Sequence, residues 1–393
     1  MKKKILFVIN SMGCGGAEKS LLSLLSLLDY DRYDVTLQMF RRGGMFENLI
    51  PAEVKIREDL DYTKFCSKSL MEQMLSFDFK RVCARICTSL FLRKNAKDGY
   101  PLHDAQAYWK HSGKAFDKLA EQYDVAIAWG QGNPTHFVAE KVAAAKKYAW
   151  VNADYKNVGH NRDFDKEIYA EYNGIVCVSD KLRKMFIQVF PEYADRCSTI
   201  FDIQNATLIE KMAREKVELT KYGTTLVTVG RLVPQKGYDI AAEAAKILKE
   251  RGVEFHWYIV GDGDRESIEA DIVRYGIDDC FTLLGAKANP YPYMKAADIY
   301  VQTSRFEGYC LTLAEARMLN IPCVTTAFDV VYDQMIDGEN GLVVDMNAQA
   351  VANGIERLMN DADLYAHIKD YQMREKKGNI EEIEKFYRLV REC

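Results

Sequence analysis

Two separate series of short apolar segments, alternating with helix-like stretches, constrain the fold more than any other feature of the sequence. The first series comprises residues 4–9, 33–40, 124–130, 147–152 and 174–179. The second comprises 225–230, 255–261, 281–285, 298–303, 322–326 and 341–344, with helix-like stretches at 238–250 and 265–275. Buried apolar runs separated by helices are typical of parallel strands in α/β domains. The sequence therefore predicts two doubly wound, Rossmann-like domains.

The domain boundaries follow from these two series. We expect a first domain at 1–200, a linker at 201–222, a second domain at 223–378 and a last helical segment at 379–393. A chain of 393 residues is long enough for two domains. Ligands of such sheets bind beyond the carboxyl ends of the strands, where the candidate motifs lie.

Composition excludes several classes of protein. The net charge of −4 gives no electrostatic support for nucleic-acid binding. Ten cysteines occur without the spacing of a zinc site or a disulfide framework, which favours a reducing compartment. No apolar run reaches the roughly 18 residues of a membrane span. We expect a cytoplasmic protein that is soluble or attached peripherally to the inner face of the membrane.

A helical insertion at 65–115 interrupts the first series and contains a basic segment at 77–97. This segment mixes Phe, Val, Ile and Leu with six Lys and Arg residues, as an amphipathic helix on anionic lipid does. A surface helix with a solvated cationic face has the same pattern. Both interpretations stay open at this point.

A glycine-rich turn follows the first apolar segment and includes Gly15 and Gly16. Backbone N–H groups at the start of a helix attract phosphate, although a plain tight turn has the same pattern. The turn is not G-x-G-x-x-G, and no acidic residue ends the second segment. An NAD site, and with it an oxidoreductase, is therefore poorly supported.

A loop at 230–237 carries Arg231 and Lys236 directly after the first segment of the second domain. The guanidinium group of Arg can donate two parallel hydrogen bonds to a phosphate, and the ammonium group of Lys supplies a compact positive charge. Both groups therefore suit a diphosphate. The loop lacks the Gly-Lys-Ser/Thr order of a Walker A motif. The competing interpretation is that both side chains are solvated cations on a surface loop and bind no ligand.

Two carboxylates, Glu307 and Glu315, lie eight residues apart across a loop-to-helix junction. Carboxylates accept hydrogen bonds from the hydroxyl groups of a sugar ring or a ribose. The competing interpretation for Glu315 is a capping box with Thr312. The pair Asp262 and Asp264 forms a DxD motif, which we interpret as a turn and a helix N-terminus rather than a metal site.

Together these motifs resemble glycosyltransferase family 4, whose members are retaining enzymes of the GT-B fold. The resemblance covers nearly the whole chain and rests on E-x7-E at 307–315, on the preceding Gly-Arg…Lys-Gly loop and on Gly-Gly-Ala-Glu at 15–18. It implies two Rossmann-like domains facing across a cleft, with a last helix at 380–391 that returns to the first domain. The activity that it implies is transfer of a hexosyl group from a nucleotide sugar to a saccharide or lipid-linked acceptor.

The resemblance also implies roles for individual residues. Arg231 and Lys236 would hold the donor diphosphate, Glu307 would contact the transferred sugar, and Glu315 would contact the ribose. The remaining donor-binding positions are Gly15, Gly16, Gly285, Tyr309, Cys310 and Leu311. No metal or other cofactor is implied.

The chain departs from the family pattern on the acceptor side. Many relatives have His where this chain has Asn152, and an amide cannot act as a base. Asp154 is the better candidate for receiving or positioning the acceptor proton. By this resemblance we expect a UDP-hexose donor, and GDP-mannose stays open as the alternative. A non-catalytic protein that binds sugar nucleotides and a metal-dependent GT-A transferase are the alternatives.

Overall fold

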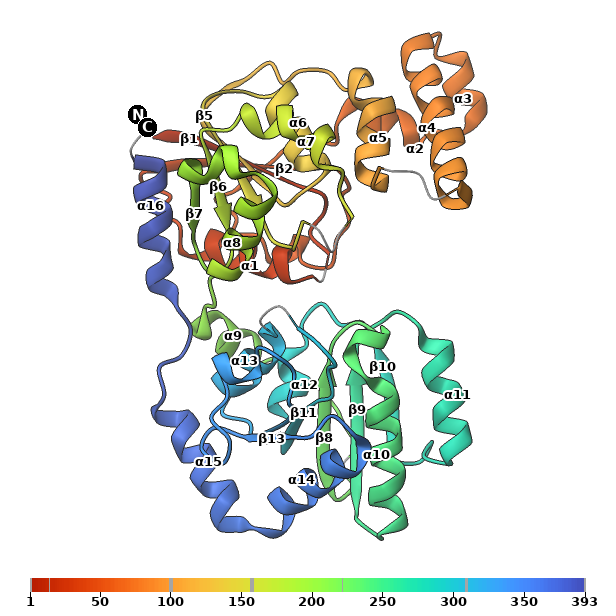
Figure 1. Ribbon diagram of the computed structural model, residues 1–393, viewed down its shortest axis with the longest axis vertical. Helices are drawn as coiled ribbons and strands as arrows, with labels where there is room; N and C mark the ends of the chain where they lie inside the picture. Colours follow the sequence, from red (N-terminus) through yellow and green to blue (C-terminus); the bar gives the residue numbers. More distant parts are fainter. Residues whose placement is uncertain are drawn as a thin grey trace. The chain divides into compact units, whose positions relative to one another are not determined.

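A computed structural model describes residues 2–13, 15–98, 102–155, 159–220, 222–307 and 310–391, without the side chains of residue 70 and of 94–98. The chain divides into two compact units (Figure 1). Unit 1 comprises Met1–Gln204 and Asn379–Cys393, and unit 2 comprises Asn205–Gly378. No helix among the described residues has the length and apolar character needed to cross a membrane.

The described part of unit 1 contains a parallel sheet with the strand order β3-β2-β1-β4-β5-β6-β7. Its strands are β1 Lys3–Ile9, β2 Tyr33–Met39, β3 Lys55–Ile56, β4 Gln122–Trp129, β5 Ala143–Val151, β6 Gly174–Cys177 and β7 Cys197–Thr199. Its helices are α1 Gly16–Leu27, α2 Asp61–Ser67, α3 Leu70–Leu75, α4 Phe79–Asp98, α5 Asp104–Ser112, α6 Asn133–Lys141, α7 Arg162–Ala170, α8 Asp180–Val189 and α16 Ile383–Arg391. The strand order reverses between β1 and β4.

Unit 2 repeats this plan with a parallel sheet in the order β10-β9-β8-β11-β12-β13. Its strands are β8 Thr224–Val229, β9 Phe255–Val260, β10 Phe281–Gly285, β11 Ile299–Gln302, β12 Cys323–Thr326 and β13 Leu342–Val344. Its helices are α9 Ala206–Met212, α10 Tyr238–Glu250, α11 Arg265–Tyr275, α12 Tyr291–Lys295, α13 Leu311–Met318, α14 Ala348–Asn360 and α15 Ala362–Arg374. Here the order reverses between β8 and β11.

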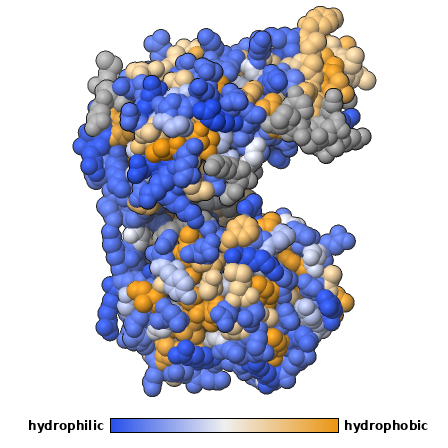
Figure 2. All heavy atoms as spheres, in the orientation of Figure 1, coloured by the Kyte–Doolittle hydropathy of each residue, from blue (hydrophilic) through white to orange (hydrophobic). Residues whose placement is uncertain are grey.

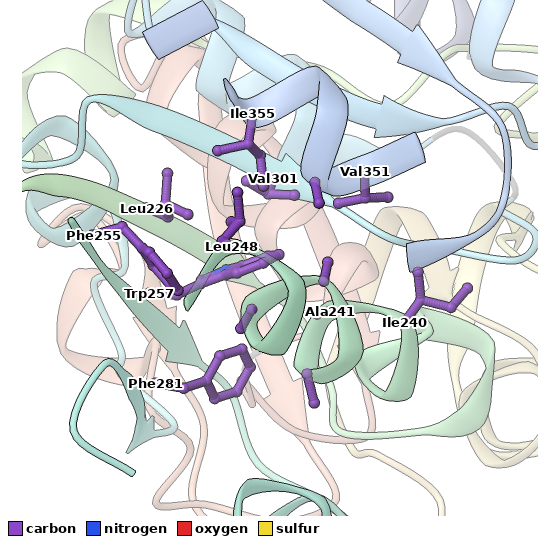
Figure 3. Close-up of a cluster of buried hydrophobic side chains, with 14 of the residues drawn as sticks. Leu226, Ile240, Ala241, Leu248, Phe255, Trp257, Phe281, Val301, Val351 and Ile355 are labelled. Atoms are coloured by element: carbon purple, nitrogen blue, oxygen red, sulfur yellow. The ribbon is translucent and has the colours of Figure 1, made fainter. Parts of the chain in front are cut away.

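One hydrophobic core of unit 2 lies between its sheet and the helices α10 and α14 (Figure 3). Trp257 of β9 and Val301 of β11 are fully buried there, together with Leu248 of α10 and Val351 of α14. Small residues of α10, such as Ala241, let that helix approach the strands closely. This packing fixes the carboxyl ends of β8 and β11, from which the candidate donor-site loops leave.

The C-terminal helix α16 packs on unit 1, beside β1 (Figure 1). The Phe386 ring is fully buried and stacks on Phe7 with 6.0 Å between ring centroids. The Tyr387 hydroxyl donates to the carbonyl of Leu27 over 3.1 Å. The predicted return of the last helix to the first domain is therefore observed within unit 1.

The chain leaves and re-enters unit 1 at two residues that hydrogen-bond to each other. The N–H of Gln204 donates to Oδ1 of Asn379 over 2.7 Å, and the N–H of Asn379 donates to the carbonyl of Gln204 over 3.3 Å. Just beyond this point, α9 belongs to unit 2, where Ile209 is buried. The predicted linker at 201–222 is therefore wrong over α9, because Ile209 packs in the core of unit 2.

Candidate functional site

The loop between β8 and α10 holds the two predicted phosphate-binding cations in different environments. Arg231 is exposed directly after β8, and Lys236 ends a short 3-10 helix at Pro234–Lys236. Gly237 follows with φ of 65°, and a Cβ there would lie 2.1 Å from the carbonyl oxygen of Thr303. Only glycine suits this position, which brings the loop against the end of β11.

Lys236 and Glu307 form an ion pair that joins the loops after β8 and β11. Lys236 Nζ donates to Glu307 Oε1 over 2.6 Å, and their side chains are only 14% and 7% exposed. The Ser304 hydroxyl donates to the same carboxylate oxygen over 2.6 Å. A buried carboxylate needs such partners because desolvation destabilises its charged form.

A polar network behind Glu307 was not predicted from the sequence. Gln302 Nε2 donates to Ser304 Oγ over 2.5 Å and lies 3.3 Å from Glu307 Oε1. The Tyr300 hydroxyl in turn donates to Gln302 Oε1 over 2.6 Å. The signal in the sequence is the polar run Gln-Thr-Ser at 302–304, since polar residues that end a buried strand need partners. These residues hold Glu307 in one orientation.

Glu315 is buried inside unit 2 rather than engaged in a helix cap. The residue is 4% exposed, and the Tyr291 hydroxyl donates to its Oε1 over 3.0 Å. The N-cap of α13 is Cys310, which makes no side-chain capping bond, and Thr312 lies within the helix. The capping-box interpretation is therefore wrong.

The N-terminus of α13 adjoins Glu307 in sequence. Cys310 adopts a left-handed conformation with φ of 66°, and α13 begins at Leu311. Burial raises the pKa of the Cys310 thiol to about 12, so the side chain stays neutral at physiological pH. The first N–H groups of a helix lack intrahelical partners and suit an anion. Tyr309 lies outside the described residues.

The remaining positions predicted in unit 2 lie at the ends of secondary-structure elements or in turns. Gly285 ends β10 with φ of 73°. Asp264 is the N-cap of α11, where its side chain accepts from the N–H of Ser267, which confirms the interpretation as a helix N-terminus. Asp262 Oδ1 accepts from the N–H of Gly263 over 2.9 Å. No group of three or more potential metal ligands (His, Cys, Asp or Glu) occurs among the residues with described positions.

In unit 1, the glycine turn after β1 contains a carboxylate of its own. Gly15 is the N-cap of α1, and Gly16 begins the helix. Burial raises the pKa of Glu18, while hydrogen bonds from the backbone at Glu18 and Gly15 act in the opposite direction. A Cβ on Gly15 would lie 2.4 Å from a Glu18 carboxylate oxygen, so a larger residue here would displace the Glu18 carboxylate.

Asn152 and Asp154 lie on the loop after β5. Gln131 Oε1 accepts from the N–H groups of Asn152 and Ala153, over 3.2 and 3.0 Å, and so fixes the start of this loop. Both polar atoms of the Asn152 side chain are buried without a hydrogen-bond partner in the described part of the chain. Because an unsatisfied buried amide is unfavourable, this side chain is suited to bind a polar ligand. Asp154 is half-buried.

The far end of the same loop is anchored by Asp165, which the sequence analysis missed. Its carboxylate lies 2.8 Å from His136 Nε2 and 3.3 Å from His160 Nδ1, and it accepts from the Tyr155 hydroxyl over 2.7 Å. Burial alone would raise the pKa of Asp165, but the hydrogen bonds with His136 and His160 hold it well below its usual value. With Asp165 on α7, His136 on α6 and the other two residues in the loop after β5, the cluster joins three segments, so no local sequence signal identifies it.

Of the segment 77–97, residues 79–97 form most of α4 and are helical as predicted. Val82 and Ala84 pack against the core of unit 1, whereas Phe79, Ile86 and Leu90 are exposed.

The predicted donor residues surround the point where the strand order of unit 2 reverses. Arg231 and Lys236 follow β8, whereas Glu307 and Cys310 follow β11, and these two strands are neighbours. Open parallel sheets bind ligands at this point because adjacent loops diverge there. Gly15 and Gly16 follow β1, at the corresponding point of unit 1.

Comparisons with known proteins agree with this geometry. Residues 210–375, within unit 2, match the family model described as "Glycosyl transferases group 1". The chain is 26% identical over 167 residues to the "Capsular polysaccharide biosynthesis glycosyltransferase CapM" of Staphylococcus aureus, over 42% of this chain and 43% of that protein. It is 31% identical over 150 residues to the "Amylovoran biosynthesis glycosyltransferase AmsK" of Erwinia amylovora, over 35% and 37% respectively. The chain thus spans less than half the length of these two relatives.

Among solved structures, the chain resembles HepE of Anabaena in complex with UDP-glucose. The TM-score is 0.66 at 17% identity, over 99% of this chain and 100% of HepE. This likeness confirms the predicted GT-B fold class, with two Rossmann-like units.

Proposed function

We propose that this chain is a retaining glycosyltransferase of family 4, because residues 210–375 match the family model of the glycosyl transferases of group 1. It transfers a hexosyl group from a UDP-hexose to a saccharide or lipid-linked acceptor in polysaccharide assembly. The observation that carries the proposal is the Lys236–Glu307 pair at the strand reversal of unit 2. The pair combines a cation that can bind phosphate with a carboxylate that can accept hydrogen bonds from sugar hydroxyls.

The donor residues stabilise the charge that develops on the leaving diphosphate. Arg231, Lys236 and the N-terminus of α13 supply positive charge and N–H donors without a metal ion. The bond between the anomeric carbon and the phosphate oxygen breaks while the acceptor oxygen bonds to the same face of that carbon. The acceptor proton passes to the leaving phosphate oxygen, which gives UDP and retained configuration.

The other predicted residues orient the substrates. Glu307 binds hydroxyls of the transferred sugar, and Glu315 serves the ribose. The donor contacts are completed by Gly15, Gly16, Gly285, Tyr309, Cys310 and Leu311. Asn152 and Asp154 bind the acceptor, and Asp154 positions the acceptor hydroxyl.

Printed names of relatives support the choice of substrates. HepE binds UDP-glucose in its solved structure, which supports a UDP-sugar donor. The names of CapM and AmsK refer to capsular polysaccharide and amylovoran biosynthesis, which supports an acceptor of polysaccharide assembly. A cytoplasmic location follows from the proposed use of nucleotide sugars and from the free cysteines of the described chain.

Nucleotide binding and turnover test the proposal together. UDP at about 100 times its dissociation constant should stabilise the protein by roughly 2.7 kcal/mol, GDP should have less effect, and EDTA should not remove the shift. Lys236→Ala should lower turnover of UDP-hexose about 100-fold or more, because a transition-state donor is lost. The matched control is Lys246→Ala, which removes a half-buried lysine of α10 that pairs with Glu250.

The outcomes separate the alternatives. Normal turnover in Lys236→Ala would refute the role of this lysine. UDP binding without turnover on any hexose would favour the non-catalytic binding protein. A UDP shift that EDTA abolishes would overturn metal independence.

A further inference from the structure

The helices α3 and α4 of unit 1 expose an unusual number of large apolar side chains. Figure 2 shows apolar residues gathered over these helices, which project from unit 1 beyond α5 (Figure 1). We call this surface the α3–α4 patch, and its members, 52–79% exposed, are Met71, Met74, Leu75, Phe77, Phe79, Ile86 and Leu90. Large contiguous apolar surfaces mark sites of binding to another apolar phase.

Only one face of α4 is needed to hold the helix on unit 1. Ala84 packs against the core of unit 1, and the Phe91 ring, seven residues further along the helix, lies 4.2 Å from the ring of His111 on α5. Phe79, Ile86 and Leu90 are spaced seven and four residues apart, so they share a different face, and this face is exposed. The helix is therefore apolar on a side that its own fold leaves open.

The turn between α3 and α4 exposes an aromatic ring to water. The backbone of the same residue adopts an unfavourable conformation. Phe77 has φ of 54°, a left-handed conformation that glycine or asparagine normally adopts, and its side chain is 79% exposed. Neither feature stabilises the protein in water. Both are explained if the ring enters an apolar phase.

Cations surround this apolar surface. Residues 68–93 contain five Lys and Arg against two Asp and Glu, a net charge of +3. Lys68 and Lys80 are exposed and form no ion pair among the described residues, whereas Arg81 pairs with Asp117. Apolar side chains beside unpaired lysines suit the boundary between acyl chains and anionic headgroups.

We propose that the α3–α4 patch docks on a bilayer that contains anionic lipids, with Met and Phe side chains in the acyl boundary and the lysines at the headgroups. A second copy of the chain is the competing occupant, but it would bring two cationic rims together. Compared with the predicted segment 77–97, the docking surface begins earlier, at Met71, and includes α3. The proposal does not depend on the proposed glycosyl transfer.

Vesicle flotation of the full chain without nucleotide tests this proposal. The protein should float with phosphatidylcholine–phosphatidylglycerol vesicles, but not with phosphatidylcholine alone, and added salt should weaken binding. The double variant Phe77→Asn, Phe79→Ser should lower the partition coefficient at least tenfold, because two aromatic side chains no longer enter the bilayer. Asn suits the left-handed turn, so this variant should fold normally.

A second double variant, Lys68→Ser, Lys80→Ser, should lower binding to anionic vesicles about 30-fold, from about 1 kcal/mol for each lysine. Matched controls lie in unit 2: Val273→Ser, at a residue 78% exposed, and Lys211→Ser, Lys216→Ser, at two exposed lysines. Both controls should bind as the unaltered protein does.

Three results would overturn the proposal. The first is absence of flotation with anionic vesicles, and the second is equal binding by all variants. The third is a dimer in lipid-free solution that Phe77→Asn, Phe79→Ser dissociates, which would show that the patch binds a second copy of the chain.

Discussion

At the scale of single residues, the Lys236–Glu307 pair shows why one side chain of the candidate donor site depends on another. Glu307 is nearly buried, and its Oε1 accepts from both Lys236 and Ser304. Removing one partner of a buried ion pair leaves a charge that the interior does not compensate. A substitution of Lys236 therefore alters the surroundings of Glu307 as well. The measured effect of the substitution must be attributed to both residues.

Asp202 gives the clearest pH dependence. Burial raises its pKa to about 6, despite a hydrogen bond with Ser20, and its Oδ1 has no partner among the described residues. The folded state thus binds a proton more tightly than the unfolded state, so stability falls as pH rises from about 4 to about 6. Asp202→Asn removes this penalty and should stabilise the protein by on the order of 2 kcal/mol above pH 6.

Urea denaturation of wild type and Asp202→Asn across this pH range measures the effect. The difference in unfolding free energy should shrink towards zero near pH 4. The control is Asp195→Asn, at an exposed aspartate of the same unit. A difference that does not vary with pH would contradict this account of Asp202.

At the scale of secondary-structure elements, the ends of β8 and β9 approach so closely that only glycine is tolerated. A Cβ on Gly261 would lie 1.8 Å from the carbonyl oxygen of Gly230. Gly261→Ala should therefore separate the two strand ends and lower stability by more than about 3 kcal/mol, since backbone atoms cannot move aside cheaply. The midpoint of thermal unfolding should report the change.

Gly252→Ala is the matched control. Gly252 has φ of 74°, but a Cβ there would meet nothing within 4 Å. Its substitution should cost only about 1 kcal/mol, from the strained backbone. Similar losses in both variants would argue against the steric explanation.

The elements could be predicted where the local pattern was strong. The helices 238–250 and 265–275 and the strand 281–285 were predicted with the bounds that the structure shows. The strands β3 and β7 were missed because they have two and three residues and lie at the sheet edges, where partner strands rather than local sequence create them.

The candidate site was predictable only in part, for a similar reason. Lys236 and Glu307 stood out because they follow apolar segments in loops, and the fold brings them together. Gln302 and Ser304 did not stand out, since their role depends on a contact with Glu307 that spacing does not reveal. The Asp165 cluster joins residues up to 29 positions apart and depends wholly on tertiary structure.

At the scale of the whole molecule, the C-terminal helix completes the core of unit 1. Phe386 is fully buried and stacks on Phe7, and it also lies 6.3 Å from the Trp150 ring. Phe386→Ala should destabilise unit 1 by about 3–5 kcal/mol, because a large cavity forms beside β1. Urea denaturation followed by tryptophan fluorescence measures this, since three of the four tryptophans lie in unit 1.

The control for this experiment lies on the same helix. Arg388 is exposed, and Arg388→Ala should leave the transition nearly unchanged. An equal midpoint for Phe386→Ala and Arg388→Ala would show that α16 does not stabilise unit 1.

The hydrogen bonds between Gln204 and Asn379 also have a consequence for how the molecule can be altered. Unit 2 is one uninterrupted segment, 205–378, whose two ends meet at that pair. The family match at 210–375 lies wholly inside it. Both junctions of a chimaeric protein can therefore be placed at residues that are neighbours in space and lie outside the hydrophobic cores of the two units. Under the proposed function, a relative's segment inserted there should carry its own nucleotide-sugar preference into the new chain, and unit 1 would keep every residue of its sheet.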